Sequence, residues 1–186
     1  SFVDSPIENE ISGGFKAGET TDDTIVAFIA AKALINTHGE INPLDIVHSI
    51  EKWSLDNPKS KTIVGPSTRL AFDAIHAGVP VEEAGRQGET NGAGTRVAPV
   101  GAIVKSSDIE TLCRKVQNVC MATHNTSTAL SGACAIAAAV AHGIEGGRLE
   151  DMVQVVLGAA ECGSHLGREV PSPLVSERIK YSLKLS

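Results

Sequence analysis

The stretch from Ala129 to Ala141 constrains the fold most, because it is dominated by alanine and broken only by Ser131 and Gly132. Alanine favours helices strongly, and its small side chain lets neighbouring helices approach closely. The pattern predicts a helix from about 126 to 142 that is apolar on most sides and lies at the centre of the fold. The apolar run is shorter than the roughly 20 residues of a membrane span, so we expect a buried core helix.

The other segments also follow a helical period. Aromatic residues make up only 3% of the chain, so aliphatic side chains must fill the core, as in closely packed helices. No period-2 pattern typical of a strand occurs at any length. We predict an all-α, compact multi-helix bundle forming a single domain over residues 1–186, with further helices at about 21–38, 42–53, 67–78, 107–120, 149–162 and 172–183.

Charge and cysteine content limit the partners and the compartment. Sixteen basic and 22 acidic residues give a net charge of −6, which excludes the clustered positive charge that nucleic acids and anionic membranes require. Residues 1–10 have neither a basic start nor an apolar run, so we expect no signal peptide. The four cysteines form no C-x-x-C pair, and we expect free thiols in a cytoplasmic protein.

The first chemically suggestive segment is Thr21-Asp22-Asp23-Thr24, at the start of the first predicted helix. One interpretation is helix capping, with a carboxylate or hydroxyl accepting a backbone N–H and the second acid favoured by the helix dipole. The other is a hard-cation site, because Mg²⁺ and similar ions prefer carboxylate, hydroxyl and water oxygens. Two adjacent carboxylates repel each other, and a bound divalent cation would relieve that repulsion.

The second segment runs from Thr90 to Gly101 and is rich in glycine up to Gly94. Its glycines permit close approach of a ligand to the backbone, whose N–H groups could cradle a phosphate. A plain turn with Asn91 capping a helix explains the same residues. Neither the Walker A pattern nor the Rossmann glycine pattern fits, which gives no support to an ATPase or a dinucleotide-dependent oxidoreductase.

The third segment, around Thr123-His124, is a polar interruption between two apolar helices. His124 either satisfies a helix terminus or reaches into a pocket and donates to a phosphate or hydroxyl of a ligand. The remaining histidines show no metal-ligand spacing.

Together the three segments resemble the ADP-ribosylglycohydrolase family, which includes dinitrogenase reductase activating glycohydrolases, eukaryotic ADP-ribosylhydrolases and some crystallins. The resemblance runs over nearly the whole chain. It is carried by Gly13-Gly14-Phe15, by Gly18 to Thr24, by Asn91-Gly92-Ala93-Gly94-Thr95-Arg96-Val97-Ala98-Pro99 and by Thr123-His124.

The resemblance implies an all-α fold with a binuclear Mg²⁺ or Mn²⁺ centre. It also implies hydrolysis of the glycosidic or ester bond between ADP-ribose and its acceptor, which is a protein side chain or a small molecule. Thr21, Asp22 and Asp23 become metal ligands, with both aspartates catalytic. By the same resemblance, the substrate-binding residues are Asn91, Gly92, Ala93, Gly94 and His124.

The sequence departs from the family pattern in two ways. Thr95 stands where members usually have methionine, which would alter the lining of the pocket. The family completes its metal cage with a later Asp-x-Asp-Thr segment, and nothing after Asp151 matches it, nor does its opening helix precede Ser1. We therefore expect a fragment that lacks both ends of the domain. The alternative function is an inactive, crystallin-like or ADP-ribose-binding protein on the same fold, and a hydrolase of another nucleotide or phosphoester ranks third.

Overall fold

The computed structural model describes residues 3–8 and 14–185, so Gly13 of the first motif lies outside the described residues. Within them the fold is all-α, as predicted, and the only β-type pairing is an isolated bridge between Thr126 and Arg168. The helices are α1 (Asp22–Asn36), α2 (Pro43–Asp56), α3 (Ser60–Ile63), α4 (Pro66–His76), α5 (Val81–Ala84), the 3-10 helix η1 (Asn91–Arg96), α6 (Ala98–Gly101), α7 (Ile109–Cys120), α8 (Ser127–Ile144), α9 (Leu149–Ser164) and α10 (Val175–Leu183).

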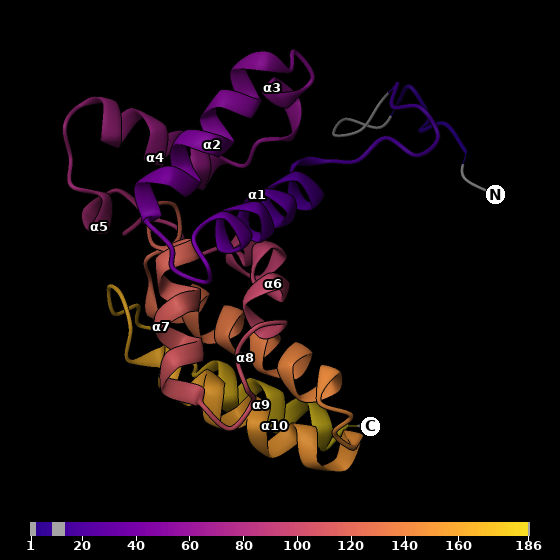
Figure 1. Ribbon diagram of the computed structural model, residues 1–186, viewed down its shortest axis with the longest axis vertical. Coiled ribbons are helices and arrows are strands. Elements are labelled where there is room, and N and C mark those ends of the chain that lie inside the picture. The colour runs from indigo at the N-terminus through magenta and orange to yellow at the C-terminus, as the bar shows by residue number, and fades with distance from the viewer. Residues whose placement is uncertain (1–2, 9–13, 186) are drawn as a thin grey trace.

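Helix α8 is the centre of the bundle, as its alanine content predicts. It packs along α9, and η1, α6 and α7 cover its other sides. Helix α1 contacts η1, α6 and α2, while α2 to α5 lie beyond it at the opposite end of the molecule from α9 and α10 (Figure 1). The order of the elements therefore places the start of α1 near the glycine-rich segment that leads into η1.

Small residues let α8 and α9 approach closely. A Cβ atom at Gly163 of α9 would lie 2.7 Å from the carbonyl oxygen of Leu130, and the Ser131 hydroxyl donates to the carbonyl of Ala160 at 2.6 Å. Helix α8 is long and apolar enough to cross a membrane by length and composition, yet 56% of it is buried within the bundle. The core around it is aliphatic, including Leu112, Val116, Leu130, Ala133, Ala137 and Ala159.

Three predicted helix starts are wrong by one to three residues. Helix α4 begins at Pro66, one residue before the predicted start, because proline is favoured in the first turn of a helix, and Gly65 is its N-cap. Helix α7 begins at Ile109, two residues after the predicted start, and its N-cap is Asp108, whose carboxylate accepts the backbone N–H of Thr111 at 3.2 Å. Helix α10 begins at Val175, three residues after the predicted start, because the backbone of Leu174, its N-cap, is not helical (φ −57°, ψ 135°).

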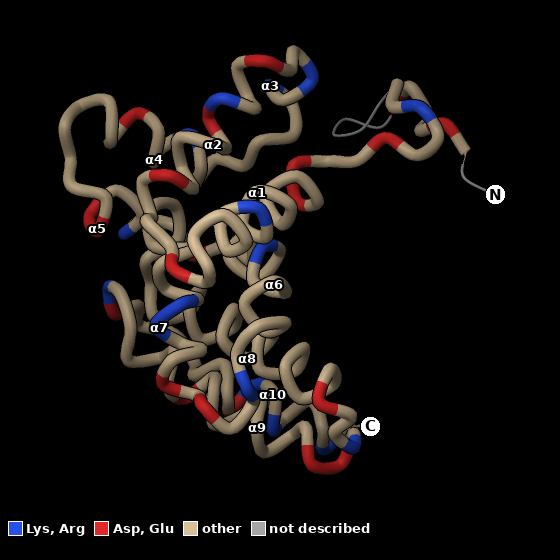
Figure 2. The backbone as a smooth tube through the Cα atoms, viewed as in Figure 1, with Lys and Arg blue, Asp and Glu red and all other residues tan. Residues whose placement is uncertain are grey.

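Charged residues of both signs are interspersed along the chain, as Figure 2 shows, in keeping with the balance expected from the sequence. In the described part of the chain, all four cysteines are free. Three of them, Cys113, Cys120 and Cys134, are buried, and burial raises the pKa of the Cys120 thiol to about 12. The Cys120 thiol therefore stays protonated near pH 7 and acts as a small apolar group in the core.

Candidate functional site

A cavity of about 380 Å³ brings together parts of all three segments singled out in the sequence. Thr21, Asp22 and Asp23 lie on its wall with Asn91 and Gly92, and His124 lines it as well. These residues come from the start of α1, the start of η1 and the turn between α7 and α8. Segments that are some 30 to 100 positions apart in the sequence thus form one site with converging polar groups.

The acidic wall of the cavity is the first turn of α1. Thr21 is the N-cap residue, but its side chain makes no capping hydrogen bond, and Asp22 and Asp23 are the first two residues of the helix. Burial, and then the neighbouring Asp23, raise the pKa of the Asp22 carboxyl above its ordinary value. Backbone hydrogen bonds at Asp22 and Asp23 act in the other direction on this pKa, so capping accounts for part of the environment of the Asp22 carboxyl. Capping does not account for the Thr21 side chain, and both residues line the cavity.

The cavity is also lined by Arg96, a residue that the sequence reasoning did not assign to the site. Its side chain is only 3% exposed, and its Nη1 donates to the Thr123 hydroxyl at 3.0 Å. Its Nε has no hydrogen-bond partner in residues 3–8 and 14–185. Asp22 and Asp23 are the acidic residues whose negative charge acts on this guanidinium. A buried cation with an unused donor thus stands in the same cavity as two carboxylates.

His124 is held between two threonine hydroxyls. Its Nδ1 lies 2.8 Å from Oγ1 of Thr123, and its Nε2 lies 2.9 Å from Oγ1 of Thr90. Burial, and then the charge of Arg96, lower the pKa of His124 to about 3, so the imidazole is neutral near pH 7. Both alternatives considered for this residue meet here, since it is buried and hydrogen-bonded and still lines the cavity.

Backbone contacts position the turn that carries His124. A Cβ atom at Gly88 would lie 2.0 Å from the carbonyl oxygen of Thr123, so only glycine fits there. Next to the cavity, a Cβ at Gly92 would lie 3.0 Å from Nε2 of His124. Gly88 in the loop and Gly92 at the start of η1 therefore allow the backbone to contact the turn that carries His124, a second role for small residues besides close approach to a ligand.

Two residues expected to bind substrate lie outside this cavity. Ala93 is fully buried in the core, and its carbonyl accepts the Cys120 thiol at 3.5 Å. Gly94 faces α8, where a Cβ would lie 2.6 Å from Cδ1 of Ile136. In return, the cavity includes Thr90, Arg96 and the first turn of α4 with Ser67 and Thr68. The one signal for Arg96 in the sequence is its positive charge, which stands directly before the apolar residues Val97-Ala98-Pro99.

Comparison with known proteins identifies the family. The family model described as ADP-ribosylglycohydrolase matches residues 2–182. The chain belongs to this family. The match includes every segment that lines the polar cavity, so the family assignment and the geometry concern the same residues.

Two curated relatives of this ADP-ribosylglycohydrolase-family chain cover almost all of it. The uncharacterized protein YegU of Escherichia coli (strain K12) is 31% identical over 185 residues, which are 99% of this chain and 55% of YegU. An uncharacterized protein of Archaeoglobus fulgidus is 29% identical over 185 residues, again 55% of its length. The chain thus spans about half the length of these relatives.

The donor chemistry of the cavity fits a hard cation. Thr21, Asp22 and Asp23 offer one hydroxyl and two carboxylates, the oxygen ligands that Mg²⁺ and Mn²⁺ accept. No group of three His, Cys, Asp or Glu side chains able to hold a metal occurs among the described residues. The remaining positions of an octahedral shell would therefore fall to the Thr21 hydroxyl, to water and to ligand oxygens, which is common for Mg²⁺.

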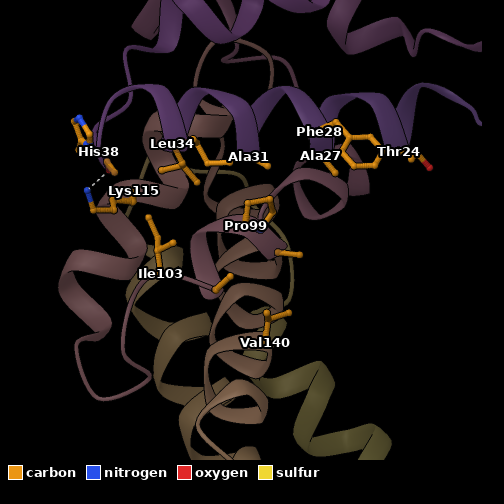
Figure 3. Close-up of a pocket in the computed structure, with 14 residues that line it drawn as sticks. Thr24, Ala27, Phe28, Ala31, Leu34, His38, Pro99, Ile103, Lys115 and Val140 are labelled. Atoms are coloured by element: carbon orange, nitrogen blue, oxygen red, sulfur yellow. Dashed lines mark hydrogen bonds between the residues drawn. The ribbon is translucent and has the colours of Figure 1, made fainter.

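A second, larger hollow of about 870 Å³ lies along the other side of α1 and is mostly apolar. Figure 3 shows Phe28, Ala31 and Leu34 of α1 facing Pro99 and Ile103 across it. Lys115 stands at one end, but its ammonium is already bound to the Gly39 carbonyl and to Glu40. This groove suits apolar groups and lacks the convergent polar groups of the α1–η1 cavity.

Proposed function

We propose that this protein is a hydrolase that uses Mg²⁺ or Mn²⁺ to cleave the glycosidic or ester bond between ADP-ribose and an acceptor. The observation that carries the proposal is the α1–η1 cavity, in which the Asp22–Asp23 pair, the Asn91–Gly92 backbone and His124 converge. Membership of the ADP-ribosylglycohydrolase family supports the reaction class. The acceptor is an ADP-ribosylated protein side chain or a small ADP-ribose conjugate.

Asp22, Asp23 and Thr21 would hold the metal. A divalent cation held by these residues would lower the pKa of a coordinated water by several units and would orient sugar hydroxyls. It would also offset burial and the repulsion from Asp23, which together raise the pKa of the Asp22 carboxyl. This role explains why two carboxylates stand side by side in a partly buried helix start.

The substrate would lie across the cavity between the two walls. The backbone at Asn91 and Gly92, at the start of η1, would hold the diphosphate and keep the anomeric carbon of the distal ribose in place. Positive charge develops on that carbon as the bond breaks, and a carboxylate of the Asp22–Asp23 pair would stabilise it. The neutral imidazole of His124 lines the cavity and would orient the Thr90 side chain, to which it is hydrogen-bonded and which also lines the cavity.

The proposal is tested by measuring release of free ADP-ribose from a panel of conjugates linked through arginine, serine and acetyl ester. We expect Mg²⁺- or Mn²⁺-dependent release from at least one conjugate, and a loss of a hundredfold or more in Asp22→Ala and Asp23→Ala, as is typical when a metal or electrostatic group is removed. Unaltered turnover in both variants would refute the assignment.

A thermal-shift experiment separates the hydrolase from a protein that only binds ADP-ribose. ADP-ribose and Mg²⁺ are added separately and together. A joint stabilisation larger than the sum of the two separate shifts is expected for the enzyme, because metal and ligand share one cavity. A response to ADP-ribose that is independent of metal would instead indicate a binding protein.

A further inference from the structure

The hydrogen bonds around His124 have a direction that is set at their buried end. A guanidinium only donates hydrogen bonds, so Nη1 of Arg96 must donate to Oγ1 of Thr123 over their 3.0 Å contact. The Thr123 hydroxyl oxygen thereby accepts one hydrogen bond, and the single hydroxyl proton is left to be donated to a second partner. The acceptors within reach are Nδ1 of His124 at 2.8 Å and the Cys120 carbonyl at 3.5 Å.

The shorter contact takes the proton. At 3.5 Å the Cys120 carbonyl is at the outer limit for an O–H donor, whereas 2.8 Å is typical of a good hydrogen bond. The Arg96 charge polarises the Thr123 hydroxyl, which strengthens it as a donor and disfavours a second N–H pointing toward the cation. Nδ1 of His124 is therefore an acceptor, and the ring proton of the neutral imidazole lies on Nε2.

The direction carries through to Thr90. Nε2–H of His124 donates to Oγ1 of Thr90 over 2.9 Å. The Thr90 hydroxyl oxygen thus accepts the hydrogen bond from His124 through one of its own lone pairs. The proton of the Thr90 hydroxyl has no acceptor within the described part of the chain. Thr90 is solvent-exposed and lines the cavity, so this proton is available to a ligand there.

We propose that Thr90 is the ligand-contacting end of a one-way hydrogen-bond chain, Arg96 to Thr123 to His124 to Thr90, and that its hydroxyl donates to a phosphate oxygen of the bound ligand. His124 is then a positioning residue that touches Thr90 rather than the ligand. The chain starts at a buried cation, and each donor in it is strengthened by the one before, so its free end favours a negatively charged acceptor. This step rests on the proposed function, in which the acceptor is the diphosphate of ADP-ribose.

The first arm of the test does not depend on any ligand. The ¹⁵N shifts of histidine-labelled protein near pH 7 report which ring nitrogen of His124 carries the proton. We expect protonation of Nε2 in the wild type and an unchanged tautomer in Thr90→Val. A proton on Nδ1 would reverse the chain and overturn the proposal.

The second arm measures ADP-ribose affinity by calorimetry in the presence of Mg²⁺. Thr90→Val removes the hydroxyl but keeps the shape, and we expect a ten- to hundredfold weaker affinity, the usual effect of losing a hydrogen bond to a charged group. Thr90→Ser restores the hydroxyl and should bind within about threefold of wild type. Thr128→Val removes a hydroxyl that bonds to Ser172 away from the cavity, and should bind like wild type.

Equal affinity of Thr90→Val and wild type would overturn the role of Thr90. If the wild type does not bind ADP-ribose, the proposed function fails, and the same variants are titrated with inorganic pyrophosphate. The same order of affinities with pyrophosphate would support Thr90 as a phosphate donor for another ligand. Absence of pyrophosphate binding would overturn the Thr90 proposal too.

Discussion

At the scale of single residues, the electrostatics of the cavity depend on Arg96. The guanidinium is buried, the charges of Asp22 and Asp23 act on it, and Thr123 supplies its one side-chain hydrogen bond in the described residues. Sequence motifs pointed to the acidic pair and to His124 because adjacent carboxylates and a lone histidine at a helix junction are visible as residue types. They could not point to Thr90 or Thr123, because hydroxyls gain a role only through the contacts that folding creates.

His124 gives a prediction for stability against pH. Its pKa is about 3 in the folded protein and about 6.5 when unfolded, so the unfolded chain takes up the proton first as pH falls. Its contribution to stability is present above about pH 6.5 and is lost as pH falls toward 3. The difference in unfolding free energy between wild type and His124→Gln should therefore narrow by about 1 kcal/mol from pH 7 to pH 5.5 in urea titrations.

The control is His48→Gln on α2, an exposed histidine outside the cavity. The stability of this variant should run parallel to that of the wild type over the same pH range. Parallel curves for His124→Gln as well would show that His124 is not held neutral by burial.

Thr123→Val should destabilise the protein by about 2 to 3 kcal/mol. The change preserves the volume of a side chain that is 1% exposed, but it leaves Nη1 of Arg96 without its acceptor in the described structure. Urea unfolding at pH 7 measures the loss, and Thr128→Val should stay within about 0.5 kcal/mol of wild type. A loss no larger than that of Thr128→Val would contradict the buried Arg96–Thr123 contact.

At the scale of elements, the long helices were predictable, but some helix starts and the contacts of the segments that connect the helices were not. The helical period and the alanine-rich run predicted α1, α2, α7, α8 and α9 within a few residues of their observed bounds. The predicted starts of α4 and α10 differ from the observed ones, because Pro66 occupies the first turn of α4 and the Leu174 backbone before α10 is not helical. The way residues 85–88 press on the His124 turn depends on backbone contacts between distant segments, which no local pattern encodes.

A pair of glycine substitutions tests this contact. Gly88→Ala would place a Cβ 2.0 Å from the Thr123 carbonyl oxygen, so the loop must move, at a cost of about 2 to 4 kcal/mol. Gly132→Ala within α8 meets no atom of the described structure within 4 Å and should stabilise the protein by about 0.5 to 1 kcal/mol through helix propensity. Thermal unfolding of both variants measures the two changes in stability, which should have opposite signs. Equal effects would contradict the close packing at Gly88.

At the scale of the whole molecule, the bundle places the start of α1, the start of η1 and the α7–α8 turn around one cavity. The all-α class followed from the alanine-rich, aromatic-poor sequence, whereas the convergence of these three segments required the packing of α1 across η1. The apolar groove on the other side of α1 could not be anticipated, because α1 is apolar around much of its surface and its sequence does not distinguish the two faces.

Metal binding should reverse the effect of Asp22 on stability. A raised carboxyl pKa favours the folded state only at low pH, and that stability is lost as the pH rises through the folded pKa, so ionised Asp22 opposes folding near pH 7. In a chelator, Asp22→Asn should therefore be more stable than wild type by about 0.5 kcal/mol, a small value because solvent screens the partly exposed pair.

Added Mn²⁺ should stabilise the wild type and leave Asp22→Asn unchanged in the same unfolding titrations. Asp151→Asn, an exposed residue of α9, is the matched control and should respond to Mn²⁺ like wild type. An Asp22→Asn variant that still gains stability from Mn²⁺ would place the metal elsewhere.

The central claim is that one cavity holds both the metal and ADP-ribose. It is tested most directly by crystals grown with Mn²⁺ and ADP-ribose, with diffraction data collected at the manganese absorption edge. The account predicts an anomalous peak bonded to Asp22 or Asp23, and a diphosphate within hydrogen-bond distance of the Thr90 hydroxyl. A manganese peak remote from α1, or ADP-ribose bound in the apolar groove beside Phe28, would contradict it.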